Sequence, residues 1–290
     1  MNDTQTPAAA EFARPSWLRE IPAGEYHLAT KNNQYLTSHR LAVFRKDPLE
    51  YKKRCDGVIV EADTAAFTLG RAAHVLVLEG EKRFADEFDV CDGPENPKTG
   101  KPFGRETKAY AEWAATLMRP VVSTADKALI DSLRAAVHAH PVAKRLLAEP
   151  GAFAEGTVRT SWNGVRVQAR PDWFNPSTGT LLDLKTCADV DRFRFDVRDF
   201  GYLYQLAFYR KCLALAGYEG EVHCWIVAVE KKEPFRVAVL RVTESTVDDH
   251  NLQHFVSEGV RDDNDAMVDE LKSCREVDIW PTRYEEAIIV

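Results

Sequence analysis

The sequence has none of the closely spaced cysteine pairs that hold metal clusters. Its six cysteines are widely separated and form no CxxC motif. Zinc ribbons and iron–sulfur clusters are therefore not expected. A chain of 290 residues, 45% of them hydrophobic, can bury a large core without a disulfide framework.

Long apolar runs are also absent. No stretch of about eighteen consecutive apolar residues occurs, so no transmembrane helix is expected. The first residues, MNDTQTPAAAEFARPSW, lack the basic and apolar parts of a signal peptide. We therefore expect a cytoplasmic protein with no membrane partner, whose residues 1–20 form a flexible arm.

An excess of basic residues, which would favour nucleic acid as a partner, is missing as well. The formal net charge is −7. However, residues 241–290 hold 13 acidic and 5 basic side chains, so the rest of the chain is nearly neutral. Local basic clusters such as RKDPLEYKKR and DRFRFDVRDF can still meet phosphate.

The hydrophobic pattern changes near residue 153. Helical patterns dominate before it, with breaks near Pro48 and Pro141, and Gly80 is a plausible helix end. After it, alternating stretches flank Asn163-Gly164, a strong hairpin signal. We expect an α/β (α+β) fold with a mixed central sheet flanked by helices.

One domain over residues 21–290 is expected from this order of elements. Its parts would be a helical half over about 36–150, a sheet core over about 153–243 and an acidic helix over 244–274. In that last helix, Leu252, Phe255, Val256 and Val260 lie at helical spacing and would be buried.

Charged residues interrupt an apolar strand in RPDWFNPSTGTLLDLKTC, residues 170–187. Asp183 and Lys185 are two apart and share one face, while Leu182 and Leu184 share the other. Asp172 would end the preceding strand, and the turn NPSTG would bring it beside them at a sheet edge. A surface ion pair is the simpler explanation of a D-x-K tripeptide by itself.

Two carboxylates and an ammonium at one place suggest metal-dependent phosphodiester chemistry. Carboxylate oxygens suit Mg²⁺, and Mn²⁺ can substitute. Such an ion polarises a phosphodiester and activates a water. Lys185 would orient that water or offset negative charge on the phosphate.

This pattern resembles the PD-(D/E)xK nuclease superfamily, with Asp172 in the PD position and Asp183-Leu184-Lys185 as the second half. The resemblance implies a restriction-endonuclease-like core and a metal held by Asp172, Asp183 and the Leu184 backbone carbonyl. Gln205 and Tyr209 resemble the QxxxY motif of the RecB-like branch, which helps to hold the DNA or the geometry of the site; an ordinary amphipathic helix whose tyrosine caps the core is the alternative. His74 resembles that branch's metal-site histidine, and Glu155 its first acid; a core histidine and an exposed loop glutamate are the alternatives.

The longer run of segments resembles the RecE-like (exonuclease VIII type) exonucleases of prophages. The segments that carry this resemblance are LTSHRLAVFRKDPLEYKKR, FTLGRAAHVLVLE, HPVAKRLL, RPDWFNPSTGTLLDLKTC and FGYLYQLAFYR. It implies an Mg²⁺-dependent exonuclease in a bacterial or phage-infected cell that degrades linear double-stranded DNA, 5′ to 3′. It further implies 3′ single strands for a RecT-like annealing protein and a homo-oligomeric ring.

Basic residues of the helical half would build a wall of the DNA channel. The candidates for phosphate contact are Ser38, His39, Arg40, Arg45, Lys46, Lys98, Lys101, Arg105 and Lys108. For the last four, a solvated loop over 92–108 is the alternative. Two other functions stay open: a DNA-binding or assembly module without turnover, and an endonuclease or single-strand nuclease of the same superfamily. Cleavage of linear, nicked and circular duplex would separate them.

Overall fold

The structure is a computed structural model that describes residues 14–60, 64–243, 255–256, 260–261 and 263–283. Its central feature is a mixed sheet with the order β11-β10-β9-β8-β5. The strands are β5 (Phe153–Ala154), β8 (Trp173–Asn175), β9 (Thr180–Cys187), β10 (His223–Glu230) and β11 (Val237–Val242). β9 and β10 are parallel, and the other pairs are antiparallel. The predicted α/β fold with a mixed sheet is confirmed.

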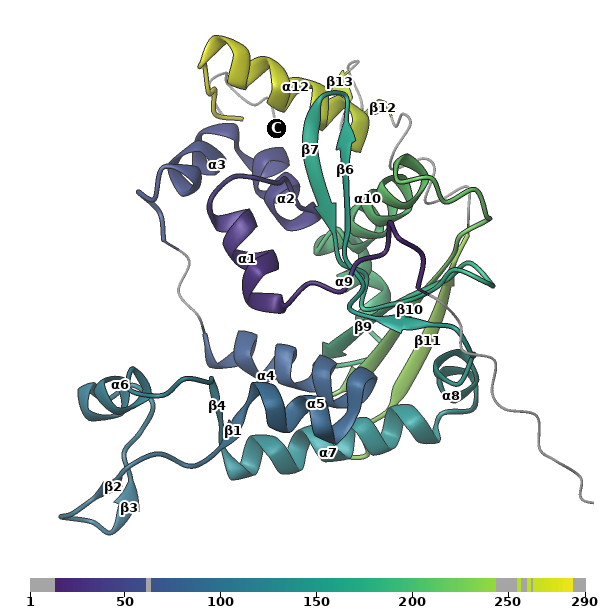
Figure 1. Cartoon of the computed structure of the whole chain (residues 1–290). Coiled ribbons are helices and arrows are strands. Elements are labelled where there is room, and N and C mark those ends of the chain that lie inside the picture. The colour runs from purple at the N-terminus through teal and green to yellow at the C-terminus, as the bar shows by residue number, and fades with distance from the viewer. Residues whose placement is uncertain (1–13, 61–63, 244–254, 257–259, 262, 284–290) are drawn as a thin grey trace, which may run out of the picture.

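Helices from the N-terminal half cover one face of the sheet (Figure 1). They are α4 (Ala65–His74), a π-helix (Val75–Glu79), α5 (Gly80–Glu87), α7 (Thr124–Ala139) and α8 (Pro141–Leu147). Leu182 and Leu184 of β9 pack against this layer with Val227 and Val229 of β10. Pro141 separates α7 from α8 as predicted. Gly80, with a φ of 85°, is the C-cap of the π-helix as predicted, and α5 begins at the same residue.

The opposite face is covered by a second set of elements. They are α2 (Ser38–Lys46), α3 (Pro48–Cys55), the hairpin β6 (Val158–Trp162) and β7 (Val165–Ala169), α9 (Phe193–Asp199), α10 (Tyr202–Leu215) and α12 (Asn264–Val277). The predicted Asn163-Gly164 hairpin is confirmed, with Trp162 paired to Val165. Leu181 and Cys187 of β9 belong to this layer, so the strand alternates as expected.

Smaller elements complete the description. They are α1 (Ala23–Lys31), β1 (Asp89–Val90), β2 (Glu95–Asn96), β3 (Lys101–Pro102), α6 (Lys108–Ala114), β4 (Val121–Val122), β12 (Phe255–Val256) and β13 (Val260–Arg261). β2, β3 and α6 project from the body beyond the short β1–β4 pair (Figure 1). Among the described residues, no helix has the length and hydropathy needed to cross a bilayer.

The strand expected over VRVQARPDW is divided in two. β7 ends at Ala169 and β8 begins at Trp173, and the two strands belong to different sheets. Pro171 lies in the break and has no N–H to donate to a ladder. Asp172 therefore lies in a short connection between the hairpin and the central sheet, and not at the end of a strand.

The acidic helix expected over 244–274 is wrong over its middle part. Residues 255–256 and 260–261 are antiparallel strands, so the expected helical stripe of Phe255, Val256 and Val260 does not form, while residue 252 lies outside the described residues. The last part of the expected helix is observed as α12, which starts at Asn264 because the Asp263 side chain caps it by accepting from the Ala266 N–H.

Part of the segment expected to be a flexible arm is packed against the body. Leu18 is 1% exposed, and Arg19 and Thr157 exchange backbone hydrogen bonds of 2.8 Å. Trp17 lies against Phe174, with ring centroids 6.2 Å apart. The apolar pair Trp17-Leu18 is the sequence signal for this packing. Residues 1–13 lie outside the described residues.

Candidate active site

The site forms where β9 extends past its neighbour β8. β8 pairs with β9 only as far as Leu182, opposite Trp173, and residues 183–187 of β9 are paired only with β10. Asp172 occupies the space beside the unpaired edge: its Oδ2 accepts a 2.7 Å hydrogen bond from the Leu184 N–H. The charged residues were expected at the edge of the sheet, but β9 is its middle strand. Only the part of β9 beyond Leu182 lacks a neighbouring strand on the β8 side.

Asp183 is fully buried on β9 and pairs with Lys185. Its Oδ2 lies 2.5 Å from the Lys185 Nζ. Its Oδ1 is buried and has no hydrogen-bond partner in the described part of the chain. Burial raises the pKa of Asp183 to about 6, with Lys185 opposing that effect and Asp172 adding to it. A buried carboxylate oxygen without a donor is free to bind a cation.

Lys185 keeps its charge in this setting. Burial by itself would lower the pKa of Lys185, but Asp183 and Asp172 together raise it above its ordinary value. Because the side chain remains an ammonium, it can offset negative charge that develops nearby.

His74, Glu155 and Asp172 form a second group beside this pair. One ligand atom from each lies within 4.8 Å of the others. The His74 Nδ1 is 3.6 Å from the Asp172 Oδ2. His74 is the last residue of α4, directly before the π-helix, and such π segments are frequent at functional sites. The three candidates that the sequence singled out separately therefore converge.

Glu155 is held in place by both its backbone and its side chain. Its φ is 52°, and its N–H donates a 3.0 Å hydrogen bond to the Asp172 carbonyl. Its Oε2 accepts from the Arg170 Nε at 2.5 Å, and Arg170 also donates to the Ile21 carbonyl at 2.9 Å. Burial and the nearby Asp172 raise the pKa of Glu155 to about 7, and Arg170 opposes the rise. The reading of Glu155 as an exposed loop residue is wrong.

Side chains from α10 complete the surroundings of Lys185. The Lys185 Nζ donates to the Gln205 Oε1 at 3.2 Å, and the Gln205 Nε2 donates to the Tyr209 hydroxyl at 2.7 Å. The ring of Tyr202 lies 4.7 Å from the Lys185 Nζ. Sequence reasoning found Gln205 and Tyr209 but missed Arg170 and Tyr202. The signals were available: Arg170 directly precedes Pro171-Asp172, and Tyr202 is one helical turn before Gln205.

The donor set fits a divalent cation. Carboxylate oxygens with one imidazole nitrogen suit Mg²⁺ or Mn²⁺. The free Asp183 Oδ1 and the clustered ligand atoms of His74, Glu155 and Asp172 are the observations that support the fit. The Leu184 N–H fixes Asp172, and the Leu184 carbonyl as a ligand stays a prediction.

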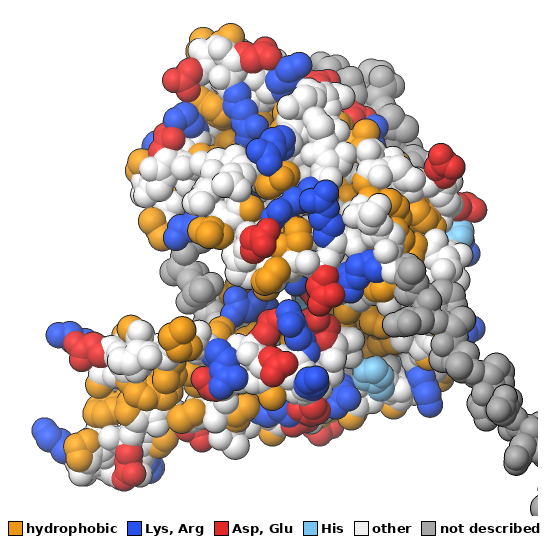
Figure 2. Space-filling view, viewed as in Figure 1, with side chains coloured by type: hydrophobic (Ala, Val, Ile, Leu, Met, Phe, Trp, Pro, Cys, Tyr) orange, Lys and Arg blue, Asp and Glu red, His pale blue; other side chains and the backbone are white. Residues whose placement is uncertain are grey.

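The residues expected to contact DNA have mixed environments. Arg45 donates to the Asn264 Oδ1 at 2.5 Å and lies over the Tyr204 ring, and Arg105 pairs with Asp126 at 2.6 Å. Both therefore have structural partners. The other members, Ser38, His39, Arg40, Lys46, Lys98, Lys101 and Lys108, are half-buried or exposed. Figure 2 shows Lys and Arg mixed with acidic side chains on the visible face, without one continuous basic stripe. DNA contact at these positions stays a prediction.

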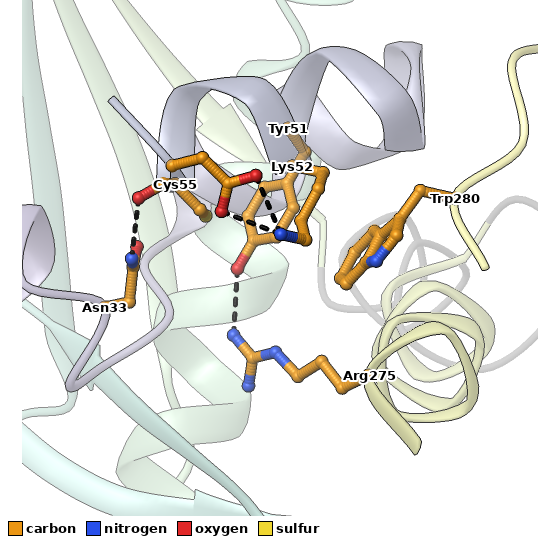
Figure 3. Close-up of a pocket in the computed structure, with 7 residues that line it drawn as sticks. Asn33, Tyr51, Lys52, Cys55, Arg275 and Trp280 are labelled. Atoms are coloured by element: carbon orange, nitrogen blue, oxygen red, sulfur yellow. Dashed lines mark hydrogen bonds and ion pairs between the residues drawn. The ribbon is translucent and has the colours of Figure 1, made fainter. Parts of the chain in front are cut away.

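A surface hollow lies elsewhere, between α3 and the end of α12 (Figure 3). Tyr51 stacks on Trp280 with centroids 5.9 Å apart, and Arg275 donates to the Tyr51 hydroxyl at 2.8 Å. Lys52 binds Asp56 on the same wall. The hollow shares no residue with the acidic cluster, and its contacts join α3 to α12.

Comparisons with known proteins agree with this geometry. A family model described as "PDDEXK-like domain of unknown function (DUF3799)" matches residues 40–288. The chain also resembles the crystal structure of a candidate exonuclease from Eubacterium rectale. That match has a TM-score of 0.64 and 13% identity, and it covers 93% of this chain and 91% of that chain. At this identity, the likeness shows the fold alone.

Two other comparisons add nothing to the assignment. The structure of SSO0001 matches with a TM-score of 0.25 and 17% identity, over 43% of this chain and 59% of that chain. No curated protein matches the sequence.

Proposed function

The chain belongs to the PDDEXK-like family, and from that premise we propose that it is a metal-dependent deoxyribonuclease. One observation carries the proposal. A buried carboxylate with a free oxygen, Asp183, pairs with a charged lysine on a strand next to the clustered ligand atoms of His74, Glu155 and Asp172. A purely structural ion pair does not need three further ligand groups beside it.

The roles of the residues follow from their positions. Asp172 and Asp183 would hold Mg²⁺ or Mn²⁺, with His74 and Glu155 assisting. The ion, when bound, supplies a polarised phosphodiester and an activated water. Lys185 would stabilise the charge that develops on the phosphate. Gln205, held by Tyr209, accepts from Lys185 and so limits where the ammonium can point.

The finer part of the proposal is an exonuclease on linear double-stranded DNA. It rests on the RecE-like resemblance of the motifs and is in line with the description of the Eubacterium rectale structure as a candidate exonuclease. Degradation would run 5′ to 3′ and leave 3′ single strands. A RecT-like annealing protein and a homo-oligomeric ring belong to the same proposal.

A single assay tests this function. The purified protein is incubated with Mg²⁺ and with linear, nicked and closed circular duplexes that carry a distinct label at each end. We expect release of nucleotides from 5′ ends of linear duplex, no attack on closed circles and no cleavage in excess chelator. The Asp183→Asn variant is the control, because it keeps the shape of the side chain and removes its charge.

The outcomes separate the candidate functions. Cutting of closed circles would identify an endonuclease, and attack on single strands alone would identify a single-strand nuclease. Undiminished cleavage in excess chelator, or by the Asp183→Asn variant, would reject the metal site. DNA binding without cleavage under any metal would indicate a binding module.

A further inference from the structure

An exposed aromatic ring lies beside the candidate active site. The buried side of α9 carries Phe193 and Val197, and Phe200 continues the same spacing just past the end of the helix. Phe200 is nevertheless 66% exposed. A second phenylalanine, Phe195, is also exposed, but it lies on the opposite side of α9, where its ring contacts Arg194.

Tyr202 connects Phe200 to the site. The rings of Phe200 and Tyr202 have centroids 5.8 Å apart, and the Tyr202 ring also lies 6.0 Å from the ring of Phe193. The same Tyr202 ring lies 4.7 Å from the Lys185 Nζ. The exposed ring is therefore separated from the ammonium by a single aromatic side chain.

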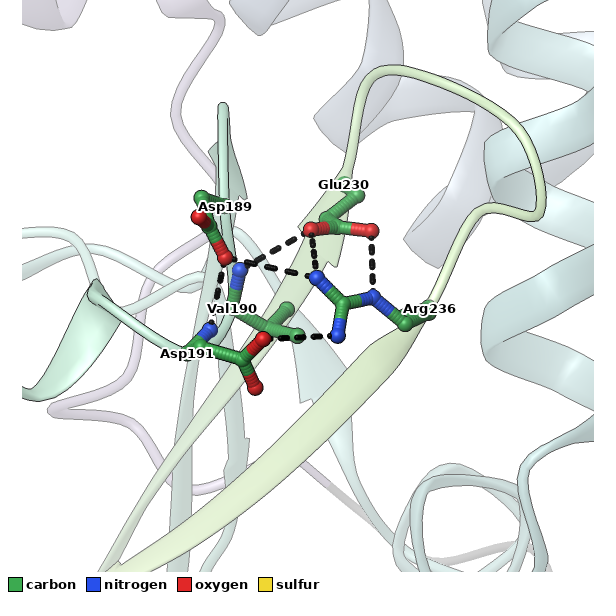
Figure 4. A network of polar contacts seen from close by, with 5 residues as sticks. All are labelled: Asp189, Val190, Asp191, Glu230 and Arg236. Carbon is green, nitrogen blue, oxygen red and sulfur yellow. Dashed lines mark hydrogen bonds and ion pairs between the residues drawn. The ribbon is translucent and has the colours of Figure 1, made fainter.

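A polar network anchors the chain just before this helix (Figure 4). Glu230, which is fully buried at the end of β10, accepts from the Val190 N–H at 3.1 Å. Arg236 lies directly before β11. Its guanidinium binds the carboxylates of Glu230 at 2.6 Å, Asp191 at 2.9 Å and Asp189 at 3.3 Å. One guanidinium is thus shared by three carboxylates, and it ties the start of the segment to the central sheet.

The charges around the ring are mixed, so binding of a nucleic acid there would depend on its bases as well as on its phosphates. Arg192, Arg194 and Arg198 are exposed on or next to α9. The Arg198–Asp199 pair spans 3.4 Å between largely exposed side chains, and such a pair yields readily to a phosphate. Asp196 and Asp199 balance part of this positive charge, so attraction to phosphate by itself would be weak.

We propose that Phe200 and Tyr202 form a stacking platform for an unpaired base next to the scissile phosphate. The inference rests on the proposed nuclease function and extends it to the form of the substrate. Stacking on an aromatic side chain needs a base with a free face, which single strands offer and an intact duplex does not. The platform would hold a frayed or separated nucleotide while Lys185 faces its phosphate.

The test measures binding, and it compares Phe200 with Phe195, the exposed phenylalanine on the opposite side of α9. Anisotropy of a fluorescein-labelled oligothymidylate and of a blunt hairpin duplex is recorded in Ca²⁺, and gels verify that both stay intact. Phe200→Ala should weaken binding of the single strand about tenfold, the effect of losing one stacked base. Phe195→Ala should change it less than about twofold, and Phe200→Trp should restore it. Circular dichroism verifies that each variant is folded.

Several results would overturn the platform. These are equal losses for Phe200→Ala and Phe195→Ala, full binding by Phe200→Leu, and an equal loss of affinity for blunt duplex. Wild-type protein that does not bind the oligothymidylate would also reject it. Because binding needs no turnover, a protein that binds as expected but never cleaves would reject the nuclease function and leave the platform intact.

Discussion

At the scale of single residues, Lys185 is the most diagnostic position. Lys185→Ala removes the charge and leaves both carboxylates, so metal binding should persist. The rate of single-turnover cleavage should fall by about 10²–10³-fold, because the ammonium acts where charge develops. Calorimetric titration of metal and quenched-flow cleavage check the two halves of this prediction. Lys272→Ala, at an exposed lysine on α12 outside the candidate DNA contacts, is the control, and a Lys185→Ala enzyme as fast as that control would refute the assignment.

The buried carboxylates predict how stability depends on pH. The pKa of Asp183 is raised to about 6 and that of Glu155 to about 7, so the folded state holds protons that the unfolded chain has lost. Their contribution to the free energy of unfolding is full below about pH 4 and is lost as the pH rises through about 6 to 7.

A divalent ion should reverse this trend. It binds the deprotonated carboxylates, so its stabilising effect should grow with pH. Urea unfolding in chelator and in excess Mg²⁺, at about pH 5 and about pH 8, measures both effects. Equal stabilisation by Mg²⁺ at the two values would show that these carboxylates do not bind the ion.

At the scale of elements, two histidines around the π-helix provide a matched pair. His74, on α4, has its Nδ1 3.6 Å from the Asp172 carboxylate, whereas the His138 Nε2 of α7 lies 2.9 Å from the Val77 carbonyl in the π-helix. His74→Ala should weaken metal binding and leave the thermal midpoint of the metal-free protein nearly unchanged. His138→Ala should lower the free energy of unfolding by about 1–2 kcal/mol, through the lost hydrogen bond, without affecting metal affinity.

Metal titration and thermal unfolding on both variants decide between the two roles of His74. If His74→Ala instead destabilises the protein and binds metal like wild type, His74 is a core residue and not a ligand.

At the scale of the whole molecule, α12 belongs to the same core as the central sheet. Leu271 is fully buried with Met267 and Val268, and Trp162 of the hairpin donates to the Asp265 Oδ1 at 2.7 Å. Leu271→Ala should therefore lower the free energy of unfolding of the entire chain by about 2–5 kcal/mol. Calorimetry and urea unfolding should show one cooperative transition, as a single domain requires.

The control for α12 is Lys272→Ala at the neighbouring exposed position, which should have little effect. Two separated transitions in the Leu271→Ala variant would mean that α12 and the sheet core are independent units, against the single domain predicted over 21–290.

The chemistry of the site was readable in the sequence because it is local. Asp183 and Lys185 share a face by the two-residue period of a strand, and Gln205 and Tyr209 by the four-residue spacing of a helix turn. The same periodicities predicted the mixed fold. The helix breaks at Pro48 and Pro141 were predicted from proline, which cannot continue a helix from its interior. The pattern was misleading at Phe255, Val256 and Val260, because a few apolar residues at helical spacing do not exclude a pair of short strands.

Tertiary structure alone decided what surrounds those residues. Because β8 does not extend past Leu182, the Leu184 N–H is available to donate to Asp172. Packing also places His74 next to Asp172, although the two are nearly one hundred residues apart in the sequence, and it pairs Arg170 with Glu155. It also buried Leu18, packed the partly buried Trp17 against the core, and set Tyr202 between Lys185 and Phe200. The physical reason is that periodicity specifies which residues of one element share a face, whereas contacts between elements depend on how the apolar faces pack together and on which polar groups that packing removes from water.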